Sequence, residues 1–243
     1  MLRIFSKSDV GLVRKSNEDA CNSGILPDGA AWAVVCDGMG GANGGGVASG
    51  IAVDRISERI LTGYSAEIGE VEIQSLISDA VLNANDAVHA RAGADETLSG
   101  MGTTVVVAVV SRGVAHIVHA GDSRAYLITP DEIRQLTTDH SMVQEMVDKG
   151  DLTAQEAKKH PQKNIITRAL GVDPFLQADY CEVPFSAGSR LLICTDGLTN
   201  YLDEEQIFLL AKESDADDLT ARLVALAKQA GGSDNITVTV IEN

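Results

Sequence analysis

Apolar and polar positions follow two kinds of pattern along this chain. Alternating or continuous apolar runs predict β-strands at residues 2–8, 31–36, 103–110, 115–120, 125–129, 190–194 and 236–241. Apolar residues at helical spacing predict α-helices at residues 46–61, 70–92, 203–212 and 217–230. The strands arrive in hairpin-like clusters and the helices in pairs, unlike the regular alternation of a parallel sheet. The order of elements therefore predicts an α+β fold of antiparallel sheets covered by helices.

A polar, partly helical insert interrupts this pattern at about residues 139–171. Within it, Thr153 precedes Glu156 by three residues, which is the spacing of a capping box at a helix start. Two interpretations stay open: an ordinary surface helical hairpin, or a flap that gates a neighbouring site. Gly150 and Gly171 are candidate hinges of such a flap.

The composition suits one globular domain over residues 1–243. Of the 243 residues, 44% are hydrophobic and 22% are charged, which allows a sizeable core. No apolar run approaches the roughly 20 residues of a membrane span, and the first residues lack the apolar segment of a signal peptide. We therefore expect a cytoplasmic protein that does not enter a membrane.

Charge and cysteine usage narrow the possible functions. The formal net charge of −16 would repel phosphate backbones, so nucleic acid is not the expected partner. Excess carboxylate serves either solubility or the binding of cations. No CxxC pair and no HExxH spacing occurs, so we expect free thiols rather than disulfides or zinc ligands at Cys21, Cys36, Cys181 and Cys194.

Two aspartates share one local design at the end of an apolar strand. Asp37 follows AWAVVC and precedes Gly38, and Asp196 follows RLLICT and precedes Gly197. Asp-Gly is a strong turn signal, so each pair alone is typical of a turn. A glycine beside a ligand also exposes its carbonyl, which would let Gly38 coordinate a cation through its backbone.

Two further aspartates lie at strand borders. Asp122 follows HIVHAG, and Asp234 comes just before the strand that starts NITVTV. Strand ends hold side chains more firmly than loop tips do, and several carboxylates brought together would repel one another without a cation. Hard divalent ions such as Mg²⁺ and Mn²⁺ prefer oxygen ligands. The shared context of the four acids therefore favours a metal site over four separate turns.

A charged segment, GLVRKSNEDA, follows the first predicted strand. Arg14 lies just after that strand, and Glu18 and Asp19 begin the next one. Solvated loop charges would explain this pattern. Alternatively, the Arg14 guanidinium binds a phosphate through its forked donors, and the two acids hold water molecules on a metal.

In order, these segments resemble the motifs of the metal-dependent protein phosphatases, protein phosphatase type 2C, in their bacterial Ser/Thr form. The resemblance rests on VRKSNEDA, VVCDGMGGANGGGVAS, GMGTT, HAGDSRAYLI, TTDHSMVQEMVDKGDLT, HPQKNIITRALG, LLICTDGLTN and GGSDNITVTVI. Each motif alone is moderately specific, whereas their order and spacing, covering nearly the whole chain, are highly specific.

The resemblance implies a four-layer α-β-β-α sandwich of two antiparallel sheets flanked by helix pairs. It also implies two Mn²⁺ or Mg²⁺ ions at one edge of the sheets, with a weaker third ion. Asp37 matches the acid that bridges both ions, and Gly38 matches the residue that lends its carbonyl. Asp196 and Asp234 match ligands of one ion, and Asp122 matches the acid associated with the third.

The implied activity is hydrolysis of phosphoserine and phosphothreonine on proteins by a metal-activated hydroxide. Asp37 and Arg14 would be the catalytic residues, with Arg14 clamping the substrate phosphate, and Glu18 and Asp19 would contact metal-bound water. The expected partners are phosphorylated proteins and, as functional counterpart, a bacterial-type Ser/Thr kinase. We expect a monomer.

One feature departs from the family pattern. Many eukaryotic members carry a histidine where this chain has Met39, and some bacterial members carry one where it has Ala42. Neither side chain donates a proton, so a metal-bound water would have to protonate the leaving group. His140 and His160 in the insert are weaker candidates for this role, because loop histidines are usually solvated.

Three other functions compete with this one. A phosphatase of the same fold could act on a small phosphorylated molecule. A silent phosphoprotein-binding scaffold would have lost its ligands, yet Asp37, Asp196, Asp234 and Arg14 are all present. A nucleotide-binding loop at GMGGANGGG lacks the GK[ST] that such loops need.

Overall fold

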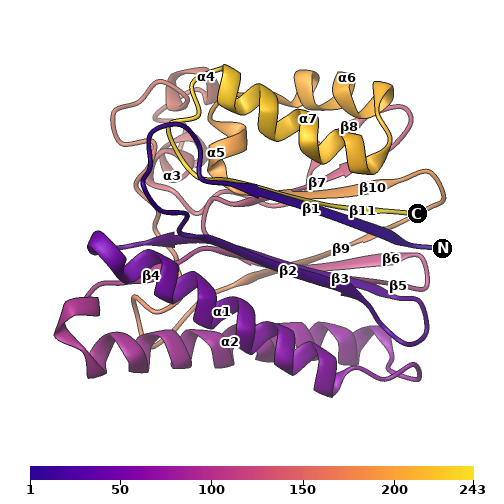
Figure 1. Ribbon diagram of the computed structural model, residues 1–243, viewed down its shortest axis with the longest axis horizontal. Helices are drawn as coiled ribbons and strands as arrows, with labels where there is room; N and C mark the ends of the chain where they lie inside the picture. Colours follow the sequence, from indigo (N-terminus) through magenta and orange to yellow (C-terminus); the bar gives the residue numbers. More distant parts are fainter.

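The computed structural model describes residues 1–243, apart from the side chains of residues 41–43. Two antiparallel sheets lie face to face between two layers of helices (Figure 1). This is the four-layer α-β-β-α sandwich that the resemblance implied. Ala42, one of the two positions that depart from the family pattern, lies outside the described side chains.

The two sheets differ in strand order, and every neighbouring pair of strands is antiparallel. The first sheet runs β1–β11–β10–β7–β8, made of β1 (Arg3–Asp9), β7 (Arg124–Ile128), β8 (Ile133–Gln135), β10 (Arg190–Cys194) and β11 (Ile236–Glu242). The second runs β2–β3–β5–β6–β9, with β4 also paired to β3; it contains β2 (Asp19–Ile25), β3 (Ala31–Met39), β4 (Gly102–Thr103), β5 (Val105–Ser111), β6 (Val114–Ala120) and β9 (Asp179–Pro184).

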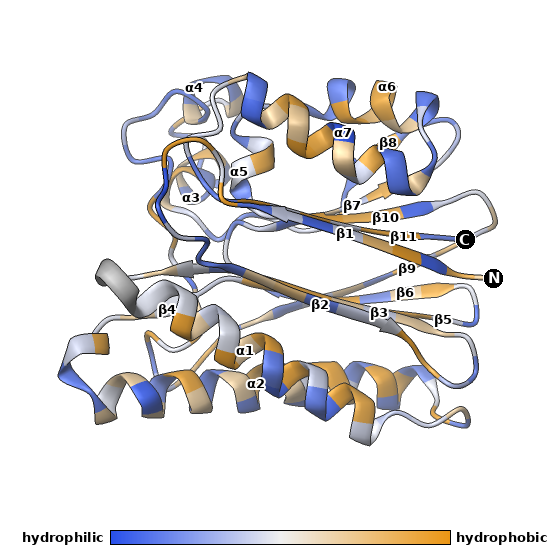
Figure 2. Ribbon diagram, viewed as in Figure 1, coloured by the Kyte–Doolittle hydropathy of each residue, from blue (hydrophilic) through white to orange (hydrophobic). Residues whose placement is uncertain are grey.

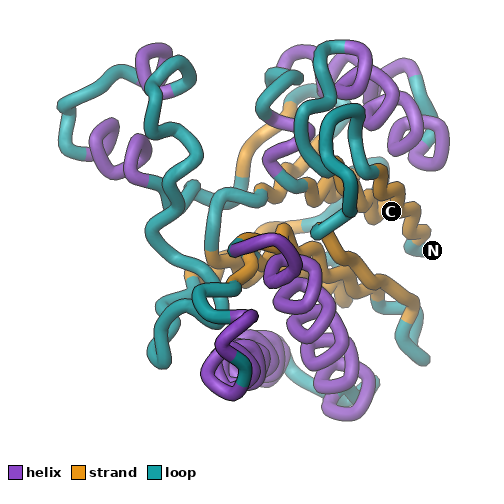
Figure 3. Tube along the Cα trace, turned by 60° about the vertical axis from the view of Figure 1, so that its left-hand side comes forward, coloured by secondary structure: helices purple, strands orange, loops and turns teal.

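Helices cover the outer face of each sheet. The second sheet is covered by α1 (Gly41–Gly63) and α2 (Glu70–Ala94), and the first by α5 (Asp196–Thr199), α6 (Glu204–Glu213) and α7 (Ala216–Gln229) (Figure 1). The insert carries α3 (Met142–Asp148) and α4 (Ala154–Ala157) and stands to one side of the sandwich (Figure 3). A 3₁₀ turn at Glu96–Leu98 precedes β4.

Three apolar clusters fill the spaces between the layers. On β3, Trp32, Val34 and Cys36 pack toward α1 and α2, while Ala33 and Val35 pack toward the other sheet. Because both faces of the central strands are buried, their sequences are continuous apolar runs rather than alternating ones. The helices turn their hydrophobic faces to the sheets and their hydrophilic faces outward (Figure 2).

Most predicted elements are confirmed, with small shifts at their ends. The predicted strand 103–110 is divided, because the chain passes from β4 to β5 at Thr104. The capping box of Thr153 and Glu156 is present at α4, and the four cysteines are free thiols. The prediction missed β8, β9 and α5 and gave no bounds for β2, of which it noted only the start; these elements are short or lie at sheet edges. Among the described helices, none is long and apolar enough to cross a bilayer.

Candidate metal centre

The second sheet brings two of the predicted acids face to face. Asp19 begins β2 and lies directly opposite Asp37 near the end of β3. Like charges in opposed positions of a sheet are destabilising. The backbone N–H of Gly38 donates to the Glu18 carbonyl (3.2 Å), and a Cβ at Gly38 would come within 2.2 Å of the Gly45 carbonyl oxygen. Only glycine permits that approach, and the approach fixes the end of β3.

The first sheet carries Asp196 and Asp234, two of the predicted metal ligands. Asp196 follows β10 and Asp234 precedes β11, and these two strands are neighbours. The Thr195 N–H donates to the Thr237 carbonyl (3.1 Å), so the pairing continues past the end of β10. Asn200 donates to Asp196 Oδ2 (2.8 Å), and the Asn235 N–H donates to Asp234 Oδ1 (2.9 Å).

Asp122 lies where the chain crosses from one sheet to the other. It follows β6 of the second sheet and precedes β7 of the first. The turn depends on Gly121, whose φ of 114° favours glycine and whose Cβ would meet the Thr104 side chain at 2.6 Å. The crossing therefore places one more carboxylate between the two sheets.

The pKa shifts of these carboxylates indicate that the side chains lie close together. Burial, followed by the charges of Asp19, Asp196, Asp122 and Asp234, raises the pKa of Asp37 well above its ordinary value. Burial, with Asp196 and Asp234 as neighbouring charges, raises the pKa of Asp19 to about 7. Burial with Asp196 and Asp139 raises the pKa of Asp122 to about 7. Acids from distant segments thus lie close enough to disfavour one another's charge.

The donor set of this cluster fits hard divalent cations. Asp19 Oδ2 accepts from Thr195 (3.0 Å) and Thr237 (2.7 Å), whereas its Oδ1 is buried with no hydrogen-bond partner among the described residues. A buried carboxylate oxygen without a partner is costly. A cation among these acids would neutralise their mutual repulsion, and water bound to it would give that atom a partner.

Arg14 lies at the rim of the acid cluster. Its Nη2 donates to Asp234 Oδ2 at 2.8 Å, and 53% of its side chain is exposed. That hydrogen bond, and then the charges of Asp234, Glu18 and Asp37, raise the pKa of Arg14. The structure therefore places Arg14 beside three of the predicted site residues, with most of its donors free to meet a ligand.

The hydroxyls of Thr103 and Thr104, which the sequence prediction missed, fix the backbone around the acids. The Asp37 N–H donates to Thr104 Oγ1 (3.0 Å), and Thr103 Oγ1 donates to the Asp37 carbonyl (2.8 Å). Thr104 Oγ1 is also hydrogen-bonded to Ser123 Oγ (2.7 Å), next to Asp122. Both threonines lie in the quoted motif GMGTT, whose order along the chain does not reveal what the hydroxyls contact.

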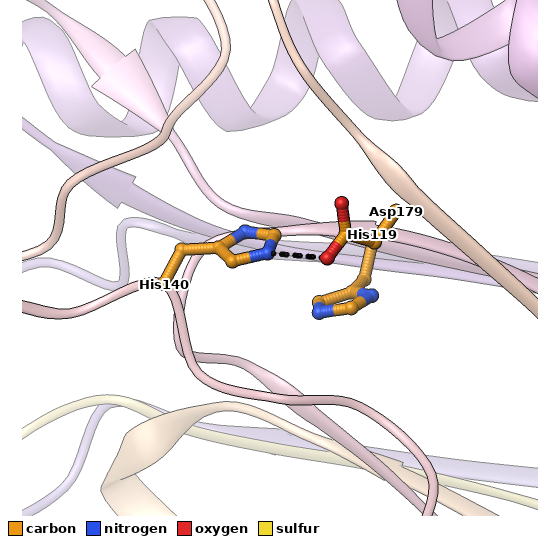
Figure 4. A group of neighbouring side chains, drawn as sticks. All are labelled: His119, His140 and Asp179. Carbon is orange, nitrogen blue, oxygen red and sulfur yellow. Dashed lines mark hydrogen bonds and ion pairs between the residues drawn. The ribbon is translucent and has the colours of Figure 1, made fainter. Parts of the chain in front are cut away.

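A second cluster of polar side chains, His119, His140 and Asp179, adjoins the turn that precedes Asp122. The imidazoles of His119 and His140 stack with centroids 4.6 Å apart, and His140 Nε2 lies 3.1 Å from Asp179 Oδ2 (Figure 4). Each residue offers a ligand atom within 4.8 Å of the others. The Gly121 N–H donates to His140 Nδ1 (3.2 Å), which assigns the imidazole proton to Nε2. That proton occupies the nitrogen that a metal would need.

The two insert histidines named for proton donation occupy different environments. His140 is 6% exposed and is held against the Gly121 backbone. His160 is half-buried in the insert, where its Nδ1 accepts a hydrogen bond from the Gln162 N–H (3.2 Å).

A cleft of ≈ 750 Å³ opens between the insert and α5–α6, and Asp122, Asp196, Lys158 and Lys163 are among its lining residues. The insert therefore forms one wall of the space beside the acids.

Comparisons with known proteins agree with this fold. The family model described as protein phosphatase 2C matches residues 13–236. The serine/threonine phosphatase stp of Listeria innocua is 36% identical over 239 residues, which are 97% of this chain and 94% of that protein. The solved structure of Stp1 from Staphylococcus aureus has a TM-score of 0.93 and 33% identity, and the match covers 100% of this chain and 95% of that one.

A further structure, the catalytic domain of PstP in complex with 2 manganese ions, has a TM-score of 0.86 and 32% identity over 99% of this chain and 97% of that one. The sandwich and these matches define a metal-dependent Ser/Thr protein phosphatase as the class of this protein. The chain belongs to the protein phosphatase 2C family.

Proposed function

We propose that this chain removes phosphate from phosphoserine and phosphothreonine in proteins, using two Mn²⁺ or Mg²⁺ ions held by the acid cluster. The observation that carries the proposal is the convergence of acids from both sheets around the unpartnered Oδ1 of Asp19. Asp37 would contact both ions, the carbonyl of Gly38 would supply a further ligand, and Asp196 and Asp234 would hold one of the ions. Asp122 would hold a weaker third ion.

The bound ions supply Lewis acidity, which lowers the pKa of water and stabilises phosphoryl charge. The chain's own residues provide position and charge around them. Arg14 binds the phosphate of the substrate, since its guanidinium is half exposed beside the acids. Glu18 and Asp19 accept hydrogen bonds from water in the site. Met39 donates no proton, so the leaving oxygen takes its proton from water.

The insert supports a protein substrate rather than a small metabolite. The cleft of ≈ 750 Å³ beside Asp122 and Asp196 is lined by residues of the insert as well as of the sandwich. A phosphorylated segment of a protein could extend along it with the phosphate at the acids. Residues 139–171 would then act as a flap within one catalytic domain over residues 1–243.

The cellular setting belongs to the same proposal. A phosphatase of this kind would work in the cytoplasm as a monomer and oppose a Ser/Thr protein kinase. The acidic chain, of net charge −16, favours neither nucleic acid nor an anionic membrane surface as a partner.

The first experiment measures turnover of p-nitrophenyl phosphate and of phosphothreonine peptides with Mn²⁺, with Mg²⁺ and with a chelator. We expect turnover that needs the cation and that falls at least a hundredfold in Asp37→Asn, because the variant loses the charge shared by both ions. Asp215→Asn is the matched control, since Asp215 caps α7 away from the acids and asparagine caps equally well.

Three results would contradict the proposal. Turnover that persists in chelator would remove the ions from the reaction. Phosphopeptides that are ignored while a panel of phosphorylated metabolites is hydrolysed would assign a small-molecule phosphatase. Tight phosphopeptide binding without any turnover would assign the scaffold.

A further inference from the structure

The loop that carries Asp122 is held from behind by one histidine. Gly121 makes two hydrogen bonds to His140: its N–H donates to the imidazole Nδ1 (3.2 Å), and its carbonyl accepts from the His140 N–H (2.9 Å). On its other side, Gly121 packs against Thr104 closely enough to exclude a Cβ. The turn before Asp122 is therefore fixed from both sides.

The imidazole of His140 is itself held in one orientation. Because Nδ1 accepts the hydrogen bond of the Gly121 N–H, the ring proton lies on Nε2, which donates a hydrogen bond to Asp179 Oδ2 (3.1 Å) (Figure 4). Arg168 Nη1 donates to the other oxygen of Asp179 (3.0 Å) and also lies 3.2 Å from His140 Nε2. His119 stacks on the ring face and is anchored by its Nε2 on the Thr138 carbonyl (2.9 Å).

We propose that His140 is a positioning residue for Asp122: through Nδ1 it fixes the Gly121–Asp122 turn so that the Asp122 carboxylate is ready to hold a divalent cation. Asp179 acts one step further back, by accepting from Nε2–H, and Arg168 holds Asp179 in place. The inference rests on the proposed function, since it assumes that a cation binds at Asp122. Partners one step behind a metal ligand commonly change metal affinity by 10–100-fold.

The test compares variants that keep or remove the Nδ1 acceptor. In His140→Asn, the amide oxygen stands where Nδ1 was and still accepts from Gly121, whereas His140→Ala and His140→Gln leave the Gly121 N–H without its acceptor. Mn²⁺ binding is followed by electron paramagnetic resonance of the free ion, and the exchange of the Gly121 amide proton by NMR. His160→Ala is the matched control, because His160 Nδ1 also accepts a backbone N–H two residues ahead but does not touch Gly121.

We expect His140→Ala and His140→Gln to weaken the loosest Mn²⁺-binding step about tenfold or more and to speed exchange of the Gly121 amide proton. His140→Asn should stay within about threefold of the parent protein in both measurements, and saturating Mn²⁺ should restore turnover in all three variants. Asp179→Asn keeps an acceptor for Nε2–H and should behave like His140→Asn, whereas Asp179→Ala should show a partial loss.

Two results would overturn the inference. One is unchanged Mn²⁺ binding in His140→Ala. The other is an equal loss in His140→Asn and His140→Ala, which would mean that the ring only fills space. Failure of the proposed function is told apart by Asp122→Ala: if that variant binds Mn²⁺ like the parent protein, no ion sits at Asp122, whatever the histidine variants do.

Discussion

A carboxylate facing a carboxylate across two strands is an unfavourable pair, yet Asp19 and Asp37 occupy opposed positions in β2 and β3. The Thr195 and Thr237 hydroxyls stabilise one oxygen of Asp19 and leave the other buried without a partner among the described residues. A chain that keeps such an arrangement sacrifices stability at one point for a function. At the scale of single residues, the site is therefore marked by carboxylates whose placement destabilises the fold.

Arg14 gives a prediction at this scale. Arg14→Ala should raise the KM for phosphopeptides roughly tenfold or more at saturating Mn²⁺, because a charge-assisted contact to the phosphate is lost. Arg14→Lys should recover part of the loss, since it keeps the charge but not the fork. Steady-state kinetics decide this, with Lys15→Ala as the exposed neighbouring control. An unchanged KM in Arg14→Ala would place the phosphate elsewhere.

At the scale of elements, the acids are held by strand ends, and the strand ends are held by hydroxyls. Thr104 lies between β4 and β5. Its hydroxyl accepts a hydrogen bond from the Asp37 N–H and is also hydrogen-bonded to the hydroxyl of Ser123, next to Asp122. One buried side chain thus fixes the spacing between two acid-bearing loops. Its methyl group also packs where a Cβ of Gly121 would lie.

Thr104→Val should therefore destabilise the protein. The Asp37 N–H would lose its acceptor in a buried place, at a cost of about 1–3 kcal/mol, which corresponds to a fall of roughly 3–10 °C in Tm for a chain of this length. Thr104→Ser keeps the hydroxyl and should recover most of the loss. Thermal denaturation in chelator checks the prediction, and equal Tm values for the two variants would contradict it.

The sequence predicts elements well where burial is two-sided and poorly where it is not. Apolar runs identified β3, β5 and β10, whose residues pack on both faces. In contrast, β9 is a partly exposed edge strand that ends in Pro184, and β8 has three residues, so neither carries a clear period. The helix pairs were found because their apolar stripes are long.

The site was predictable in part for a similar reason. The acids can be recognised in the sequence because they lie at the ends of apolar strands, and the family resemblance implied a role for each. The contacts of His140 were not predictable, because they join residues that lie 19 and 39 positions apart along the chain and depend on how β6 and β9 pair. Local patterns carry no information about such tertiary contacts.

At the scale of the whole molecule, the acid cluster draws on both sheets, so it links their stability to pH. Asp19 and Asp122 have pKa values of about 7 in the folded protein, against an ordinary value of 3.8. Groups with a raised folded pKa stabilise the fold fully below pH 3.8, and that contribution is lost as pH rises toward 7.

The cation-free protein should therefore lose stability between about pH 4 and pH 7, with Tm falling by roughly 5 °C or more. Mn²⁺ should remove most of this slope, because it neutralises the same carboxylates, and should raise Tm most at the alkaline end. Thermal denaturation across this pH range, in chelator and in Mn²⁺, provides the measurement. Asp122→Ala should flatten the slope in chelator, and a rise of Tm with pH in the parent protein would contradict the prediction.

The pairing of β1 with β11 has a consequence for how the enzyme is made. Arg3 pairs with Glu242, and Arg14 contacts Asp234, 220 positions downstream. Until β11 has been synthesised, β1 has no partner strand in its own sheet. The carboxylates of Asp37 and Asp122 then also lack Asp234, the last acid of the cluster along the chain. A nascent chain therefore cannot assemble the acid cluster, nor act through it, before β11 has been synthesised.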